Sequence, residues 1–256
     1  MDVLKKLENF YRSYRGYKGR IGQSRNGAPI YLFSVRKTRR PKIIVTYGIH
    51  AREHITTLLA LKHIKDFEKY GEIGWVYFVP AVNPDGIRIA LDKDPLYKAN
   101  AQGVDLNVNF DARWGTGAQN VFVPGSENYV GEYPFSEPET VALRDFTLNI
   151  KPDLTLSYHC KGEEIYWEFF QDEKQRERDY KFAKALSQST GYPLVTPNGS
   201  AGGYKDWCIE KLKIPALTIE VGKDSLSHPL SDKHLPDVYE KNKNALLALT
   251  EISLWI

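Results

Sequence analysis

Short apolar runs alternate with amphipathic stretches along this chain. Residues 43–49 and 75–82 are rich in β-branched and aromatic side chains, which is typical of buried strands. Between them, residues 56–70 carry apolar side chains at a helical spacing, which predicts a strand–helix–strand unit. Residues 83–86, Asn-Pro-Asp-Gly, then predict a turn.

The second half of the chain continues this alternation. Residues 136–149 begin with Ser-Glu-Pro-Glu, which predicts a helix capped by the serine. We expect two further helices over 176–190 and 237–255, and a strand over 215–221. The order of these elements predicts an α/β fold with a mixed, mostly parallel sheet and helices on both faces.

One strand of this predicted sheet ends on a histidine. Residues 153–158 alternate between the two faces, so that Leu154, Leu156 and Tyr158 share one face. Thr155, Ser157 and His159 then lie on the other face. In such sheets, functional sites gather at the carboxyl ends of the strands.

Length and composition favour one domain over residues 1–256. Hydrophobic residues make up 42% of the 256, which is enough for a well-buried core, and no Pro/Gly/Ser-rich stretch divides the chain. The net charge of +3 is mild. The basic cluster 36–40 follows an expected strand, Ile30–Val35, without a recognisable binding motif around it. We interpret it as a solvated turn and expect no nucleic-acid partner.

The remaining composition indicates a cytoplasmic protein. The N-terminus reads as the start of an amphipathic helix and not as a signal peptide. No apolar run approaches the roughly 20 residues that span a bilayer, so we expect no membrane partner. Cys160 and Cys208 fit free thiols in a reducing compartment, although the sequence also allows them to pair. We expect Cys160 to be a small buried filler.

Polar residues that packing does not explain occur at three of the apolar runs. His50 and Glu53 come after the first run, His159 ends another, and Glu220 lies inside a third. Two histidines and a carboxylate are the ligand set of a hydrolytic zinc site that leaves a fourth position open for water. Glu220 would be costly as an isolated buried carboxylate, so it requires a partner or a task. A buried structural ion pair is the alternative explanation for Glu220.

At this point the chain resembles the zinc metallocarboxypeptidases of family M14, also called funnelins. The resemblance covers nearly the whole chain and rests on motifs in the same order, which are His50-Ala-Arg-Glu53, Asn83-Pro-Asp-Gly86, Gly103-Val-Asp-Leu-Asn107, Tyr158-His159 and Thr218-Ile-Glu-Val-Gly222. It implies that His50, Glu53 and His159 bind one zinc ion and that Glu220 is the general base and acid. It also implies that Asp105 holds a zinc-binding imidazole.

The chain departs from the digestive members of this family in its substrate-binding residues. Their carboxylate-binding arginine lies inside Asn-Arg-Asn, whereas here Asn107 is followed by Val-Asn, which makes simple C-terminal trimming doubtful. Gln102 lies where a second, oxyanion-stabilising arginine is expected, and Arg88 or Arg113 are candidates to replace it. The tyrosine that closes over substrate is missing, its place falling near Asn198.

Counting back from Glu220 aligns Lys205 with the family's specificity position. A lysine there predicts an anionic substrate group, although a solvent-facing lysine at a helix start is the alternative. Tyr204 is a further candidate for this pocket. Tyr166, Trp167 and Trp207 are others, about half of the four being expected in the core.

The overall pattern most resembles the bacterial subgroup that cleaves γ-D-glutamyl–diaminopimelate bonds. We therefore expect a zinc-dependent peptidase acting on small peptides with an acidic leaving residue, best represented by γ-D-glutamyl–meso-diaminopimelate in murein fragments. Two alternatives remain. One is an acylase or amidase acting on N-acyl amino acids, and the other is a stem-peptide binding module weakened by the missing arginine.

Overall fold

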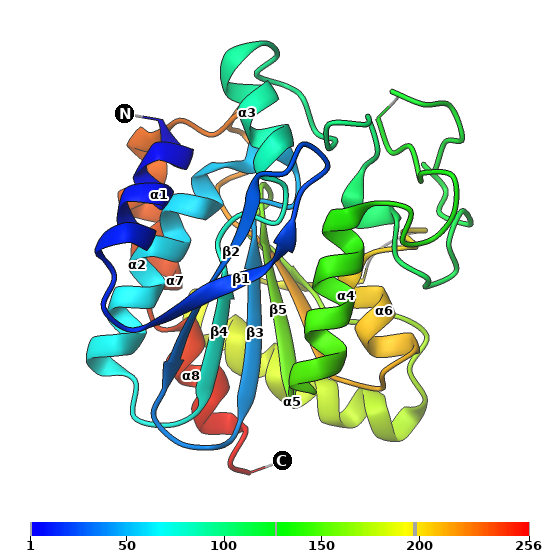
Figure 1. The fold of residues 1–256 in the computed structure, drawn as a ribbon. Helices are drawn as coiled ribbons and strands as arrows, with labels where there is room; N and C mark the ends of the chain where they lie inside the picture. The colour runs from blue at the N-terminus through cyan, green and yellow to red at the C-terminus, as the bar shows by residue number, and fades with distance from the viewer. Residues whose placement is uncertain (1, 126, 197–198, 256) are drawn as a thin grey trace.

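A computed structural model describes residues 2–125, 127–196 and 199–255. Within these ranges, eight strands form one sheet between two layers of helices (Figure 1). The strands are β1 Tyr17–Gln23, β2 Pro29–Arg36, β3 Lys42–Tyr47, β4 Trp75–Val79, β5 Leu154–His159, β6 Glu164–Tyr166, β7 Leu194–Val195 and β8 Ala216–Glu220. The helices are α1 Val3–Ser13, α2 Ile55–Tyr70, α3 Pro84–Asp92, α4 Pro138–Ile150, α5 Glu173–Thr190, α6 Tyr204–Glu210, α7 Leu235–Asn242 and α8 Ala245–Ile252. Short 3₁₀ turns cover Ala51–Glu53, Leu106–Val108 and Asp232–His234.

The strand order is β1-β2-β4-β3-β5-β8-β6-β7. Strands β4, β3, β5 and β8 run parallel in the middle of the sheet, and β6 and β7 are also parallel to each other. The β1–β2, β2–β4 and β6–β8 pairs are antiparallel. The predicted mixed, mostly parallel sheet is therefore confirmed.

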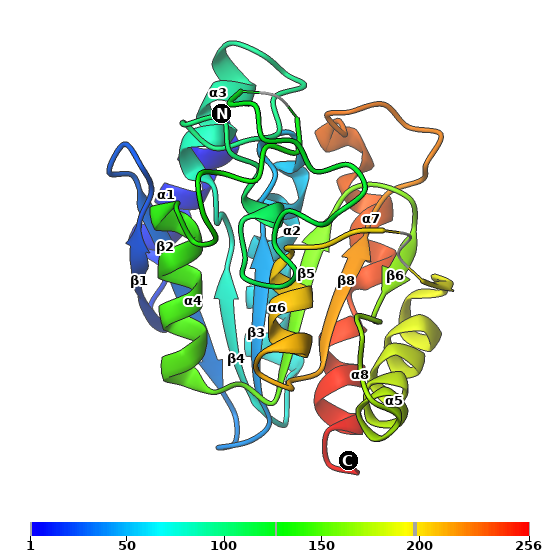
Figure 2. The same cartoon turned by 90° about the vertical axis from the view of Figure 1, so that its right-hand side faces the viewer.

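Helices cover both faces of the sheet, as predicted. Residues of α1, α2, α5, α7 and α8 pack with one face of the sheet in a single buried cluster. Helices α4 and α6 pack on the opposite face, where Figure 2 shows them in front of the central strands. Among the described residues, none of the helices has the length and apolarity needed to cross a membrane.

The alternation predicted for β5 is also confirmed. Leu154, Leu156 and Tyr158 point into the cluster under α2 and α5. Ser157 lies on the other face, where Thr46 donates a hydrogen bond to it over 2.9 Å. His159 is the last residue of the strand and lies in register with Glu220 at the end of β8. The alternation therefore directs the histidine toward the α4–α6 side of the sheet.

Three local predictions were wrong. The predicted turn at 83–86 is the start of α3, because the Asn83 side chain accepts a hydrogen bond from the Gly86 backbone and Pro84 fits the first helical turn. Ser136 does not cap α4. Its hydroxyl donates to Glu137, which takes the cap position.

The third wrong prediction is the closing helix, which is divided into α7 and α8. The Asn242 side chain, on the last residue of α7, donates to the Val238 carbonyl and to the Tyr192 hydroxyl. Asn242 and Asn244, which flank the break, are also of a residue type with low helix propensity.

Both cysteines are buried free thiols, which decides between the two possibilities left open by the sequence.

Candidate active site

The candidate site lies at the carboxyl ends of three neighbouring strands. His50 follows β3, and Glu53 ends the 3₁₀ turn that begins directly after it. His159 ends β5 and Glu220 ends β8. Parallel pairing of these strands brings the four side chains to one edge of the sheet, which is the location predicted from the sequence.

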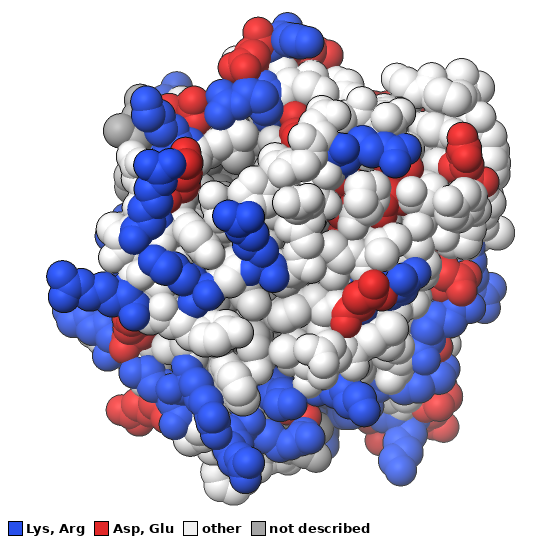
Figure 3. Space-filling model, viewed as in Figure 1, with Lys and Arg blue, Asp and Glu red and all other residues white. Residues whose placement is uncertain are grey.

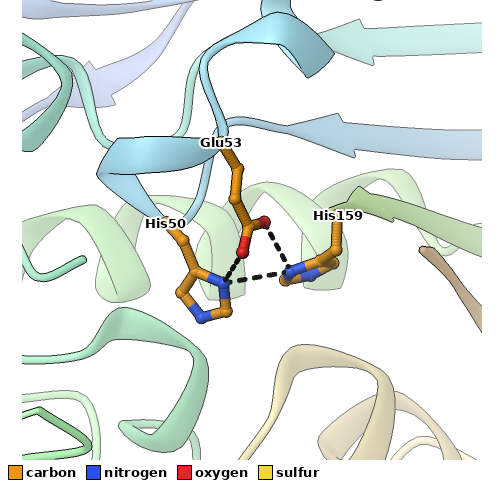
Figure 4. Close-up of side chains that lie close together, drawn as sticks. All are labelled: His50, Glu53 and His159. Atoms are coloured by element: carbon orange, nitrogen blue, oxygen red, sulfur yellow. Dashed lines mark hydrogen bonds and ion pairs between the residues drawn. The ribbon is translucent and has the colours of Figure 1, made fainter. Parts of the chain in front are cut away.

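The three predicted zinc ligands converge (Figure 4). His50 Nδ1 lies 2.8 Å from Glu53 Oε1 and 3.2 Å from His159 Nδ1. His159 Nδ1 lies 3.2 Å from Glu53 Oε2, which also accepts a hydrogen bond from the Cys160 backbone. All three side chains are buried, and their potential ligand atoms lie within 4.8 Å of one another.

This cluster fits a metal ion better than it fits a hydrogen-bonded network. Two imidazole nitrogens and a carboxylate point at one small volume, and they supply the nitrogen and oxygen donors that catalytic zinc sites use. The other nitrogen of His50, Nε2, lies 3.2 Å from Asp105 Oδ1. Asp105 is therefore placed to fix the tautomer in which His50 Nδ1 is free to bind a metal.

Electrostatics at the site are dominated by buried carboxylates. Burial alone would lower the pKa of His50, but Glu53 and Asp105 outweigh it and raise the pKa to about 9. Burial would raise the pKa of Glu53, whereas the two histidines hold it below its usual range. Burial and the charge of Glu53 raise the pKa of Glu220 well above its ordinary value. A bound cation would satisfy this excess of negative charge.

Glu220 occupies a position suited to proton transfer. It ends β8 in register with His159, its Oε2 atom is buried, and among the described residues no donor contacts that atom. It also lines a cavity of about 320 Å³ together with His50 and Asp105. A carboxylate that is desolvated, open to a cavity and without a fixed partner matches a general base better than a structural ion pair.

The same cavity is also lined by Lys205 and Asp206 from the first turn of α6. Lys205 Nζ lies 2.6 Å from Asp206 Oδ1 and donates to the Glu168 carbonyl over 2.9 Å. Lys205 thus lies in the predicted pocket and not in solvent, but it has a carboxylate partner that the sequence analysis did not include. Asn107 lines the same cavity, and its Oδ1 accepts from the Tyr204 backbone.

The structure does not bring four other predicted substrate-binding side chains into the lining of this cavity. Tyr204 is buried in the core, where its hydroxyl contacts Thr147. Arg88 pairs with Asp2 and Asp92 on the surface, and Arg113 pairs with Glu210. Gln102 is exposed and, unlike Lys98, is not among the described residues that line the cavity. Asn198 lies outside the described residues.

Lys98 is the functional candidate that the sequence analysis missed. Its ammonium lines the cavity, 2.8 Å from Asp105 Oδ2 and 2.7 Å from Asn128 Oδ1. Burial would lower the pKa of Lys98, but Asp105 outweighs it and raises it, so the group stays charged. The sequence carries a signal for it, because Lys98 is a cation only four residues before Gln102, where the family has an arginine.

Comparisons with known proteins agree with this geometry. The chain is 28% identical to the γ-D-glutamyl-L-diamino acid endopeptidase 1 of Lysinibacillus sphaericus, over 97% of this chain and 70% of the relative. It is 30% identical to the murein peptide amidase A of Escherichia coli K12, over 84% of each chain. The structure of a murein-tripeptide amidase from Escherichia coli O157 superimposes with a TM-score of 0.70 and 25% identity, covering 93% of both chains.

The family comparison covers almost the entire chain. Residues 4–245 match the family model described as zinc carboxypeptidase, Peptidase_M14. This match includes all of the strands and the four residues that converge at their carboxyl ends. The resemblance noted from the sequence is thereby confirmed, and the chain belongs to the M14 zinc carboxypeptidase family of peptidases.

Proposed function

We propose that this protein is a zinc-dependent peptidase that hydrolyses the γ-D-glutamyl–meso-diaminopimelate amide bond in small murein peptides. The observation that carries the proposal is a single cavity that is lined by His50, Glu220 and the buried Lys205. The names of two relatives, an endopeptidase for γ-D-glutamyl-L-diamino acid bonds and a murein peptide amidase, support this substrate class. We keep the cytoplasm as the proposed location.

His50, Glu53 and His159 would hold one zinc ion. When bound, zinc supplies Lewis-acid chemistry, which polarises the scissile carbonyl and makes water more acidic. Glu220 would take the proton from the attacking water and pass it to the leaving amine.

Lys98 would stabilise the negative charge that develops on the carbonyl oxygen. Its ammonium is fixed between Asp105 and Asn128, so little reorganisation is required when the charge appears. An ammonium offers three donors, of which these two contacts use two. Lys98 would thus take the task for which the sequence analysis considered Gln102, Arg88 and Arg113.

The experiment is digestion of a muropeptide mixture by the zinc-loaded protein, with products identified by mass spectrometry. We expect cleavage between γ-D-glutamate and diaminopimelate. Glu220→Gln is the control, because it keeps the shape of the side chain but cannot accept the proton, and we expect a loss of about 10²–10⁴-fold in turnover with the metal retained. Wild-type protein that releases N-acyl groups and leaves stem peptides intact would contradict the proposed substrate.

A further inference from the structure

The cavity contains an unusual second pair of charges. Lys205 and Asp206 are adjacent in sequence at the start of α6, and both side chains line the cavity that contains Glu220. Their side chains are only 8% and 4% exposed, and Lys205 Nζ lies 2.6 Å from Asp206 Oδ1. We refer to these two residues as the charge pair.

The charge pair has unused hydrogen-bonding capacity. The Lys205 ammonium has three N–H donors, and within the part of the chain that the structure describes, Asp206 and the Glu168 carbonyl accept two of them. Asp206 accepts one bond from Lys205 at Oδ1 and one from the Gly203 backbone at Oδ2. A carboxylate has about four lone-pair sites. Each member of the charge pair can therefore make a further contact with a ligand.

Neutrality of the charge pair restricts the ligand. A lone lysine would favour any anion, but Asp206 cancels its charge and would repel a purely anionic group. Lys205 would likewise repel a purely cationic group. A group that carries both charges side by side satisfies both residues, because its carboxylate can contact the lysine while its ammonium contacts the aspartate.

We propose that the charge pair binds a zwitterionic amino-acid head group at the end of the leaving residue's side chain. The inference rests on the proposed function and deepens it, because it requires an ammonium as well as a carboxylate. The distal end of diaminopimelate carries both groups on one carbon. Asp206 thereby becomes a specificity-determining residue that the motif analysis did not identify.

A purely structural role for the charge pair makes different predictions. Asp206 Oδ2 already accepts from the backbone at the start of α6, as a helix-capping carboxylate does. If capping were its only role, substitutions would lower the stability of the protein. They would change kcat/KM by the same factor for all substrates, so selectivity would stay the same. The test must therefore compare substrates within each variant.

Four peptides L-Ala-γ-D-Glu-X separate the two charges. X is meso-diaminopimelate with both groups, L-lysine with the ammonium alone, L-2-aminopimelate with the carboxylate alone, or L-2-aminoheptanoate with neither. For the wild type, we expect kcat/KM to fall about 10- to 100-fold when either group is removed from diaminopimelate. Equal values for diaminopimelate and aminopimelate would overturn the role of Asp206.

Two variants assign each group to its residue. In Asp206→Asn, which keeps an oxygen to cap α6, we expect the advantage of diaminopimelate over aminopimelate to disappear. In Lys205→Met, we expect the advantage of diaminopimelate over lysine to disappear. Lys211→Met is the matched control, since Lys211 follows the same helix but pairs only loosely with Asp111 and Glu210. Its selectivity should equal that of the wild type.

Calorimetric binding of the diaminopimelate and aminopimelate peptides to Glu220→Gln, which does not turn them over, separates this inference from the proposed function, because only the diaminopimelate peptide then carries an ammonium at the distal end. We expect Glu220→Gln to prefer the diaminopimelate peptide at least tenfold and the double variant with Asp206→Asn to lose that preference. If no peptide is hydrolysed but this binding pattern appears, the inference stands and the proposed function fails. If the peptides are hydrolysed but neither assay shows the preference, the inference fails while the proposed function stands. If neither hydrolysis nor the preference for diaminopimelate is observed, the inference and the proposed function are both overturned.

Discussion

Two lysine–aspartate pairs line the same cavity, and they differ in how far their partners are already engaged. Lys98 and Asp105 lie 2.8 Å apart, but Asp105 also contacts His50 and Lys98 also contacts Asn128. Among the described residues, the charge pair of Lys205 and Asp206 makes its other hydrogen bonds with backbone groups, and the Lys205 ammonium also lies 5.4 Å from the centre of the Phe169 ring. The first pair is therefore placed to hold the imidazole of His50, a proposed zinc ligand. The second pair is built to meet a ligand.

The surface gives little hint of this difference. Figure 3 shows lysine and arginine spread over the visible face, with acidic side chains placed among them. Exposed ion pairs of this kind contribute little to stability or recognition. Both cavity pairs are largely removed from solvent, so their charges interact more strongly than those on the surface.

The largest effect is expected from breaking the first pair at its lysine. Lys98→Met removes the donor proposed for the developing oxyanion, so kcat/KM should fall about 10²–10³-fold. Lys98→Arg keeps the positive charge and should recover part of that loss. Steady-state kinetics on the diaminopimelate peptide would measure both. A methionine variant within about threefold of the wild type would show that Lys98 is not the oxyanion donor.

Breaking the first pair at its aspartate should act on the metal instead. Asp105→Asn removes the charge beside His50 Nε2, and loss of such a partner lowers metal affinity about 10- to 100-fold. Zinc titration against a competing chelator would measure the change, with the exposed Asp111→Asn as the control. An unchanged zinc affinity would mean that Asp105 does not support the ligand.

The charge pair should respond differently in stability measurements. Lys205→Met leaves Asp206 buried without its cation, which should lower the free energy of unfolding by about 1–3 kcal/mol. Adding Asp206→Asn removes the uncompensated charge and should restore part of this loss. Urea unfolding of the two variants would measure both values. A double variant less stable than Lys205→Met would indicate a mainly structural pair.

A buried histidine outside the cavity should affect stability but not the site. His63 contacts the Tyr47 hydroxyl on the α2 side of the sheet, and burial lowers its pKa from 6.5 to about 3. Below pH 6.5 the unfolded chain takes up a proton that the folded protein excludes, so stability falls as the pH drops toward 3. The slope is at most about 1.4 kcal/mol per pH unit.

Unfolding curves between pH 7 and pH 4 would test this. His63→Gln should lose less stability with acid than the wild type, whereas the control His234→Gln should follow the wild type. Identical pH slopes for His63→Gln and wild type would contradict the assignment. His50 and Glu53 also respond to acid. Their contributions are the same in all three proteins and therefore cancel in the comparison.

The convergence of His50, Glu53, His159 and Glu220 could be predicted from the sequence because these residues lie in short motifs at strand ends. Periodicity placed His159 on the correct face of β5, and the order of elements predicted the sheet. The pairing of Lys205 with Asp206 could also have been predicted, because the two residues are adjacent in sequence. Burial and the position of both residues in one cavity, however, depend on how α6 packs against β8, which no local pattern encodes.

The two arginines proposed as substrate-binding residues show what the sequence could not predict. Arg88 and Arg113 have the correct chemistry but pair with surface carboxylates, because α3 and the loop after Ala112 direct them away from the cavity. Helix boundaries were misplaced where side chains compete for backbone groups, as Asn83 and Ser136 do. Residue type therefore identified the chemistry, and packing decided which residues could perform it.

Metal content tests the central claim, that one region of the cavity holds zinc and the other recognises substrate. Zinc per chain would be measured by mass spectrometry after dialysis of the wild type, His159→Ala and Lys205→Met. We predict one zinc ion in the wild type and in Lys205→Met, and a large loss in His159→Ala, which removes one of the three converging ligands. Equal zinc in the wild type and His159→Ala would contradict the account.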